Sequence, residues 1–242
     1  MSGIDLGYIL GHQDEYEELR YSLRSLRNFA HREVWIAGAP PPDWCVGVNY
    51  IPVTQLINEE KGRLTYEERK TNQRTNLLAI CDHPDVSQGF VFMNDDFFFV
   101  EPIPGPGLPP PPHLGTYTET HRNMAEVAGA YQKLYYWMQE HTDIGEPLHV
   151  PEHVPMVMDK TLLAEWMREV WHIHGFPVAS LWSNRANIDS YRGPDFILKR
   201  DFHRETWPEG QWAVSTVNRS FFEWPVGQKL RDMFPDPSPY ER

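Results

Sequence analysis

The sequence predicts an α/β fold with a mixed, mainly parallel central sheet flanked by helices. Three observations support this prediction. The chain opens with a strand–helix–strand–strand order, an amphipathic helix follows the first strand, and a continuous apolar run typical of a buried central strand comes later. The motifs GxGxxG, GxxxxGK[ST], GxSxG and HExxH do not occur in the sequence. Their absence disfavours nicotinamide dehydrogenases, P-loop kinases, α/β-hydrolases and zincins.

The spacing of apolar residues predicts the first elements. Residues 4–10 form a short buried strand, and residues 14–30 form an amphipathic helix with Asp14 as its N-cap. The apolar positions of this helix follow a three-to-four spacing: Tyr16, Leu19, Leu23, Leu26 and Phe29. Two more strands are expected at 33–38 and 48–53. This opening is typical of the first half of a nucleotide-binding α/β domain.

Capping signals and proline content predict the middle of the chain. Residues 65–82 form a helix with Thr65 as N-cap, and the apolar run 89–93 forms a buried strand. Residues 101–112 contain seven prolines, so they form a loop. Further helices are expected at 120–141, 159–172 and 225–233.

Composition restricts the class of protein and its partners. With 13% aromatic residues, nine of them Trp, the chain is not intrinsically disordered. Its formal net charge of −12 disfavours nonspecific attraction to nucleic acid, and we expect no nucleic-acid partner. We recognise no signal peptide and no membrane span. Two cysteines, Cys45 and Cys81, are too few for a disulfide scaffold, so we expect a cytoplasmic protein.

The acidic pair Asp95 and Asp96 is the strongest candidate for chemistry. It follows the apolar strand directly, and ligands of open α/β sheets bind beyond the carboxyl ends of strands. Carboxylate oxygens together with phosphate oxygens are typical ligands of a magnesium ion on a nucleotide diphosphate. The alternative is a simple strand-ending Asn-Asp turn. Three Phe residues follow at once, which favours a functional interpretation.

His153 and Arg185 are weaker candidates when taken alone. His153 lies between two nearby prolines, which suits a rigidly placed general base, although a lone histidine is also a common structural residue. His149 lies four residues earlier, but the prolines disfavour the helix that such a zinc pair needs. Arg185 is a possible phosphate clamp because a guanidinium group matches phosphate oxygens.

Four segments, taken in order, resemble the stealth family of sugar-1-phosphate transferases. This family acts in microbial capsule synthesis and includes the lysosomal-enzyme N-acetylglucosamine-1-phosphotransferase. The segments that carry the resemblance are 4–8 (IDLGY), 18–26 (ELRYSLRSL) with 92–97 (FMNDDF), 153–160 (HVPMVMDK) and 234–241 (FPDPSPYE). Short chains of this kind are also similar to glycosyltransferases of actinobacterial phages.

The resemblance implies a GT-A-like fold and a set of catalytic residues. It assigns catalytic roles to Asp96, with Asp95 as the alternative, and to His153 and Arg185. It also implies a single domain over residues 1–242. We expect a nucleotide-sugar-binding half at 1–100, a proline-rich loop at 101–115, and an acceptor and catalytic half at 116–242.

The resulting hypothesis is metal-dependent transfer of a hexose-1-phosphate from a nucleotide sugar to an acceptor hydroxyl. The donor is expected to be a UDP-sugar, the acceptor a glycan or protein hydroxyl, and the cation Mg²⁺ or Mn²⁺ at Asp95 and Asp96. Residues expected to bind the donor are Asp5, Arg20, Arg24, Lys70, Asn72 and Asn94. Two alternatives stay open: a glycosyltransferase that moves the sugar alone and releases a nucleoside diphosphate, and a noncatalytic sugar- or nucleotide-binding protein.

Overall fold

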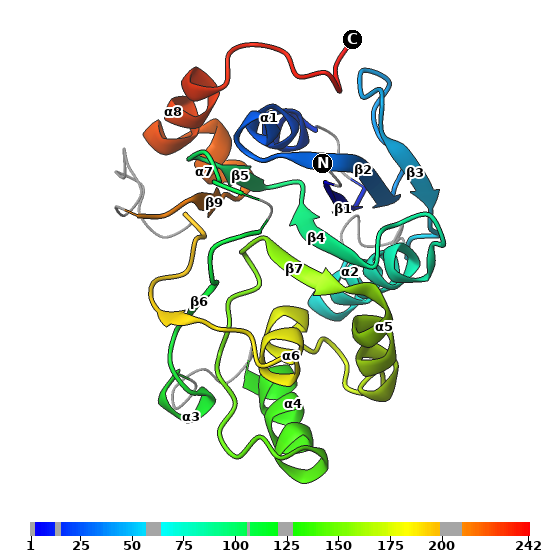
Figure 1. Ribbon diagram of the computed structural model, residues 1–242, viewed down its shortest axis with the longest axis vertical. Helices are drawn as coiled ribbons and strands as arrows, with labels where there is room; N and C mark the ends of the chain where they lie inside the picture. Colours follow the sequence, from blue (N-terminus) through cyan, green and yellow to red (C-terminus); the bar gives the residue numbers. More distant parts are fainter. Residues whose placement is uncertain (1–2, 13–15, 57–63, 106, 121–127, 199–209) are drawn as a thin grey trace.

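A five-stranded sheet forms the centre of the fold (Figure 1). The computed structural model describes residues 3–12, 16–56, 64–105, 107–120, 128–198 and 210–242. The strand order is β3–β2–β1–β4–β7. The parallel strands are β1 (Ile4–Leu10), β2 (His31–Gly38), β3 (Asn49–Pro52) and β4 (Gly89–Asn94). Strand β7 (Met156–Asp159) is antiparallel to β4. The predicted fold class, a mixed and mainly parallel sheet flanked by helices, is therefore confirmed, and it is consistent with a GT-A-like domain.

Helices α1 (Glu17–Ser25) and α2 (Tyr66–Asp82) cover opposite faces of the sheet. Successive residues of a strand point to opposite faces. On β1, the hydroxyl of Tyr8 is hydrogen-bonded to Ser22 of α1. A Cβ atom added to the preceding residue, Gly7, would lie 3.1 Å from Ile80 of α2. The sheet is therefore covered by helices on both sides, as expected for buried parallel strands.

Helix α1 is shorter than the predicted helix 14–30. It ends at Ser25 and continues as a single 3₁₀ turn, Leu26–Asn28, before the chain becomes extended at Phe29. The apolar face predicted from the spacing is confirmed: Leu19, Leu23, Leu26 and Phe29 are buried, and Tyr16 packs against the core. The predicted N-cap, Asp14, lies outside the described residues.

Helix α2 confirms the prediction for residues 65–82, including its cap. Thr65 Oγ1 accepts a hydrogen bond from the Glu68 backbone N–H at 3.2 Å, and Glu68 Oε2 accepts one from the Thr65 N–H at 2.7 Å. This reciprocal capping box satisfies backbone donors at the start of the helix.

Among the elements of the second half that the sequence did not predict are β7 and α6 (Val178–Arg185). Helix α5 (Lys160–Glu169) follows β7 directly and ends before the predicted position 172. The predicted helix 120–141 corresponds to the end of α3 (Tyr117–Thr120) and to α4 (Ala128–His141), with 121–127 outside the described residues. The predicted proline-rich loop is confirmed for its described residues 101–105 and 107–111, whereas Pro112 begins β6 (Pro112–His113) beside β8 (Tyr191–Arg192).

A second apolar cluster lies beside the main core. Strand β5 (Phe97–Phe99) pairs antiparallel with β9 (Ala213–Ser215), and its central residue Phe98 packs in this cluster. Helix α7 (Asn218–Phe222) and helix α8 (Pro225–Met233) supply much of the rest, and α8 confirms the predicted helix 225–233. Because β5 directly follows the Asp95–Asp96 turn, this cluster fixes the position of the turn.

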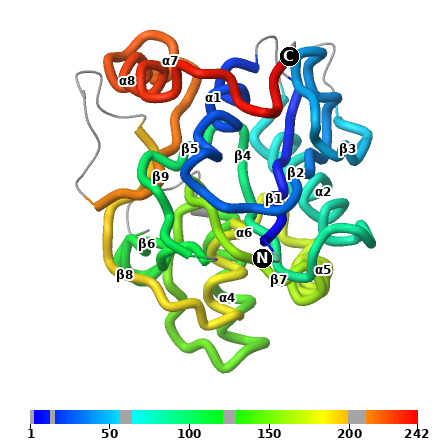
Figure 2. Tube along the Cα trace, turned by 45° about the horizontal axis from the view of Figure 1, so that its top comes forward, coloured from blue at the N-terminus to red at the C-terminus, as the bar shows by residue number. Residues whose placement is uncertain are grey.

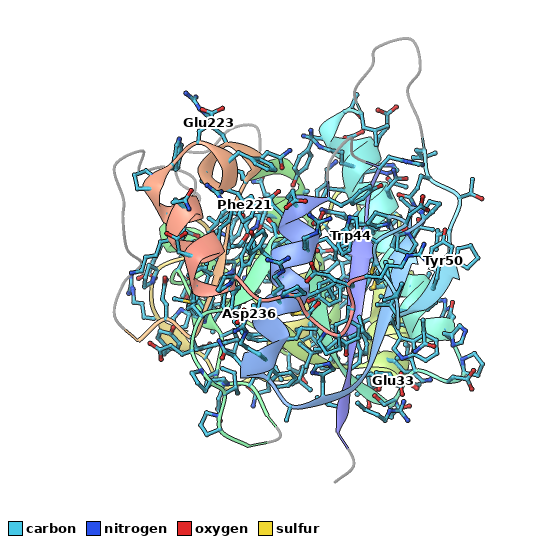
Figure 3. All side chains as sticks on the ribbon, turned by 90° about the horizontal axis from the view of Figure 1, so that it is seen from above. Glu33, Trp44, Tyr50, Phe221, Glu223 and Asp236 are labelled. Carbon is cyan, nitrogen blue, oxygen red and sulfur yellow. The ribbon has the colours of Figure 1, made fainter. Side chains whose placement is uncertain are left out.

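The C-terminal segment crosses α1 toward Trp44, as Figure 3 shows from Asp236 onward. Arg24 of α1 donates two hydrogen bonds to Glu241, at 2.8 and 2.7 Å. The Tyr240 carbonyl accepts from the Val46 N–H at 2.9 Å. The segment therefore ties α1 to the loop between β2 and β3 (Figure 2). None of the helices in the described ranges is long and apolar enough to cross a membrane.

Candidate active site

The acidic pair lies at the carboxyl edge of the sheet. Asn94 is the last residue of β4, and it pairs with Ile9 near the carboxyl end of β1. Asp95 and Asp96 form the turn that leads into β5. Since ligands of open α/β sheets bind beyond this edge, the pair lies where a ligand is expected.

His153 reaches the same edge because β7 is antiparallel to β4. Met156, the first residue of β7, pairs with Phe92 near the carboxyl end of β4. The segment just before β7, which contains His153, therefore lies beyond that end of β4. A parallel strand in the same place would have brought this segment to the opposite edge.

A pocket of about 460 Å³, part of it open to solvent, lies between α2, β4, the segment before β7 and the start of α6. Three of the predicted site residues line it: Lys70, Asn94 and His153. Apolar side chains, among them Phe92 and Phe176, form much of the remaining lining. Apolar walls with a few convergent polar groups are typical of small-molecule sites.

Lys70 is held in this pocket by Glu152. The Lys70 ammonium group is ion-paired with one oxygen of Glu152, and the other oxygen accepts a hydrogen bond from the Val178 N–H at 3.0 Å. Burial alone would lower the pKa of Lys70, but the Glu152 carboxylate and Tyr66 outweigh it and the pKa is raised. Glu152 thus links α2 to the start of α6, directly beside His153.

Asp96 is fastened by the end of β9. Ser215 Oγ donates to Asp96 Oδ2 at 3.0 Å, and the Thr216 N–H donates to the Asp96 carbonyl at 3.2 Å. Its other carboxyl oxygen, Oδ1, is buried without a hydrogen-bond partner among the described residues. Burial raises the pKa of Asp96 well above its usual range, and the charges of Asp95 and Glu18 raise it further, against the hydrogen bond from Ser215.

Glu18 is a third carboxyl group in this region. It is buried near the start of α1, and Thr216 Oγ1 donates a hydrogen bond to its Oε1 at 2.5 Å. Burial raises the pKa of Glu18 to about 7, the Thr216 hydrogen bond lowers it in part, and the charge of Asp95 adds to the rise. Two consecutive residues at the end of β9 therefore hold the two carboxyl groups, Ser215 that of Asp96 and Thr216 that of Glu18.

The acidic pair suits a divalent cation that arrives with a phosphate ligand. Carboxylate oxygens are hard ligands, and the buried Oδ1 of Asp96 is an acceptor without a donor in the described part of the chain. Within the described ranges, no group of three or more His, Cys, Asp or Glu residues is placed to hold a metal ion. Mg²⁺ is commonly bound by one or two carboxylates, with water and substrate phosphates completing the shell. The residues fit such a shared site and do not form a complete protein cage.

Two predicted donor-binding residues have structural partners elsewhere. Asp5 lies near the amino end of β1, at the edge opposite to Asn94, where Arg32 donates two hydrogen bonds to its buried carboxylate, at 2.6 and 2.5 Å. Asn72 is buried on α2, and its side-chain amide bonds both the N–H and the carbonyl of Leu56. Neither lines the pocket, and their roles in binding a donor stay predictions.

Arg20 and Arg24 lie on α1 and face the C-terminal segment. Arg20 is ion-paired with Glu17 and lies 3.6 Å from Glu241, and its guanidinium group is 4.5 Å from the Trp44 ring centre. The Arg24–Glu241 pair described above joins segment 18–26 to segment 234–241, both of which carry the family resemblance. A role in stabilising the fold is sufficient to explain why these two segments lie close together. Donor binding by either arginine stays a prediction.

Arg185 is the last residue of α6, at the end away from the pocket. The pocket contacts Val178 at the helix start, and the seven helical steps from Val178 to Arg185 span about 10 Å along the helix axis. The Arg185 guanidinium group donates to Glu169 at 2.5 Å and lies over the Trp166 ring, 4.6 Å from its centre. The structure does not bring Arg185 into the pocket, and its catalytic role stays a prediction.

Sequence reasoning missed several residues of the site as functional candidates. Glu18 belongs to the ELRYSLRSL motif and Glu152 precedes His153, so both lay inside segments that had already been singled out. Ser215 and Thr216 had no comparable signal, because their importance depends on the pairing of β9 with β5.

Comparison with known proteins supports a distant relationship between part of this chain and an exopolysaccharide phosphotransferase. No protein-family model matches the chain. A stretch of 95 residues is 28% identical to the exopolysaccharide phosphotransferase CpsY of Mycobacterium leprae. The aligned stretch covers 37% of this chain and only 17% of that protein. The match supports a stealth-like relationship for part of the chain, in agreement with the resemblance in the sequence motifs.

Proposed function

We propose that the protein transfers a sugar-1-phosphate from a nucleotide-diphosphate sugar to an acceptor hydroxyl. The observation that carries the proposal is that His153 and Asn94 line the same pocket, while Asp95 and Asp96 directly follow Asn94 at the same edge of the sheet. A general base and an acidic, cation-compatible turn are the groups that phosphoryl transfer requires. The partial similarity to a phosphotransferase supports the same reaction class. A UDP-sugar as donor and a glycan or protein hydroxyl as acceptor are parts of the proposal that rest on the sequence motifs.

In the proposed reaction His153 accepts the proton of the acceptor hydroxyl. The acceptor oxygen forms a bond to the phosphorus nearest the sugar, and the bond from that phosphorus to the bridging oxygen breaks. The nucleoside monophosphate leaves with the bridging oxygen and its electron pair. Asp95 and Asp96 would hold Mg²⁺ or Mn²⁺, whose charge neutralises the diphosphate. Ser215 keeps the Asp96 carboxyl group oriented through its hydrogen bond.

A glycosyltransferase on the same fold is the second candidate, because the sheet and helices are equally consistent with that class. It would attack the anomeric carbon and release a nucleoside diphosphate. The similarity to a phosphotransferase favours attack at phosphorus, although it covers only part of the chain.

Removing the histidine tests the proposal. Replacing His153 with alanine is expected to lower donor turnover by about a hundred- to ten-thousand-fold, the usual contribution of a general base. His174→Ala is a matched control, since His174 is exposed and does not line the pocket. Turnover is followed as nucleotide release from a panel of nucleotide sugars with Mg²⁺ or Mn²⁺. A folded His153→Ala variant with turnover like that of the control would exclude His153 as the base.

A further inference from the structure

The pocket beside His153 has two cations in its described lining, and protein groups already engage both. Arg74 is buried, and its guanidinium group donates to the carbonyls of Lys70 and Ile173, at 3.1 and 3.0 Å, and to the Thr71 hydroxyl at 3.3 Å. Lys70 is ion-paired with Glu152. The Glu152 carboxylate therefore offsets part of the positive charge of the lining, and the Arg74 guanidinium group is already hydrogen-bonded to three protein oxygens. Both cations are used in holding the pocket together, and an uncharged ligand can enter without breaking these contacts.

The same lining offers hydrogen-bond acceptor positions that donors in the described part of the chain do not fill. A carboxylate has about four acceptor positions, and Glu152 uses one for Lys70 and one for the Val178 N–H. The side-chain oxygen of Asn94 is buried, and the described part of the chain gives it no partner. Because buried acceptors without donors cost free energy, a ligand rich in hydroxyl groups would be favoured here.

Other parts of the pocket lining are apolar. Phe92 of β4, Phe176 before α6 and Ala179 of α6 face the same space. A ligand that combines C–H faces with peripheral hydroxyl groups matches both kinds of wall. A sugar ring has this combination, whereas a diphosphate does not.

We propose that this pocket receives the uncharged sugar ring of the nucleotide-sugar donor, with Glu152 and Asn94 accepting hydrogen bonds from its hydroxyl groups. The charged diphosphate then lies outside the pocket, toward Asp95 and Asp96. This inference rests on the proposed function and adds the location and the chemical basis of sugar recognition. It makes Glu152 and Asn94 specificity-determining residues.

Direct binding measurements test the inference without turnover. Calorimetry is used to compare UDP, GDP and dTDP with the corresponding glucose, N-acetylglucosamine and galactose conjugates, all in the presence of Mg²⁺. Ala179→Leu fills the pocket beside the sugar. Since one methylene group in a pocket is worth about 10- to 200-fold, this variant is expected to bind the preferred nucleotide sugar at least about tenfold more weakly. Its affinity for the free nucleoside diphosphate is expected to stay within about twofold.

Two further variants separate pocket filling from general disturbance. Ala164→Leu places the same change at a buried site on α5 that does not line the pocket, and it should leave both affinities unchanged. Asn94→Ala removes an acceptor without adding bulk, so it reports on the sugar even if Ala179→Leu does not fold. It too should weaken binding of the nucleotide sugar selectively.

The outcomes distinguish the two proposals. If the variants weaken the nucleotide sugar and the nucleoside diphosphate equally, or weaken neither, the pocket does not hold the sugar, and this inference fails while the proposed function stands. If the unaltered protein binds none of the nucleotide sugars, the proposed function fails and the inference fails with it.

Discussion

Glu18 gives the most specific prediction about stability, because it is a buried carboxyl group that takes a charge near neutral pH. Its pKa rises from an ordinary value of 4.5 to about 7 in the folded protein. Between these values the folded protein holds the proton more tightly than the unfolded chain does. The corresponding stabilisation is fully present below pH 4.5 and is lost as the pH rises through about 7. At about 1.36 kcal/mol per pKa unit, the loss amounts to about 3 kcal/mol.

Glu18→Gln keeps the shape of the side chain and an acceptor for Thr216, but it cannot ionise. The variant and the unaltered protein are therefore expected to be similarly stable at about pH 4.5, where Glu18 of the folded protein is protonated. Near about pH 8 the variant is expected to be more stable by up to about 3 kcal/mol. Urea unfolding at both pH values, followed by circular dichroism, measures the two differences.

The neighbouring, partly exposed carboxyl group of Glu17 provides the control. Glu17 is ion-paired with Arg20 at the surface of α1, and Glu17→Gln is expected to change the free energy of unfolding by less than about 0.5 kcal/mol at either pH. If Glu18→Gln changed stability by the same amount at both pH values, ionisation of Glu18 would not be coupled to folding. The interpretation that burial and the charge of Asp95 raise the pKa of Glu18 would then be wrong.

Asp96, Gly227 and Glu241 each give a further testable expectation. The affinity of the protein for Mn²⁺, measured by calorimetry with a nucleoside diphosphate present, should rise with pH. The pKa of Asp96 is raised, so a proton must leave its carboxyl group before a cation binds. Equal affinities at about pH 6 and pH 8 would contradict this expectation. Gly227→Ala places a Cβ atom 1.9 Å from the Phe221 carbonyl oxygen. It should therefore lower the free energy of unfolding, measured in urea, by more than about 2 kcal/mol. A change under about 0.5 kcal/mol would show that α7 and α8 adjust freely. Glu241→Gln removes the negative charge and one of the two oxygens that accept hydrogen bonds from Arg24, so it should cost about 2 kcal/mol by the same assay. No loss of stability would mean that the C-terminal segment does not stabilise α1.

Elements with strong local signals could be predicted from the sequence. Strand β4 is a continuous apolar run, and α2 begins with a complete capping box, so their local sequence and final structure agree. Strand β7 has only four residues and exists through its pairing with β4. Helix α6 is buried from Val178 through Ser183 and has no polar face to give a helical period. These two elements depend on tertiary contacts, which explains why they were missed.

The candidate site shows the same division. The acidic pair follows β4 in sequence, so its place at the carboxyl edge could be predicted from the fold class. The approach of His153 depends on the antiparallel direction of β7, and only the family resemblance had connected this residue with the pair. The raised pKa of Glu18 depends on burial and on Asp95, which come together only in the folded protein. Neither relationship can be obtained from spacing along the chain.

The nucleotide product distinguishes sugar-phosphate transfer from transfer of the sugar alone. The protein is incubated with its preferred nucleotide sugar, a divalent cation and a panel of glycan and peptide acceptors, and the products are analysed by phosphorus NMR and mass spectrometry. We expect release of a nucleoside monophosphate and formation of an acceptor that carries a sugar linked through a phosphodiester. Release of a nucleoside diphosphate, with the sugar attached to the acceptor without phosphorus, would contradict it and identify a glycosyltransferase.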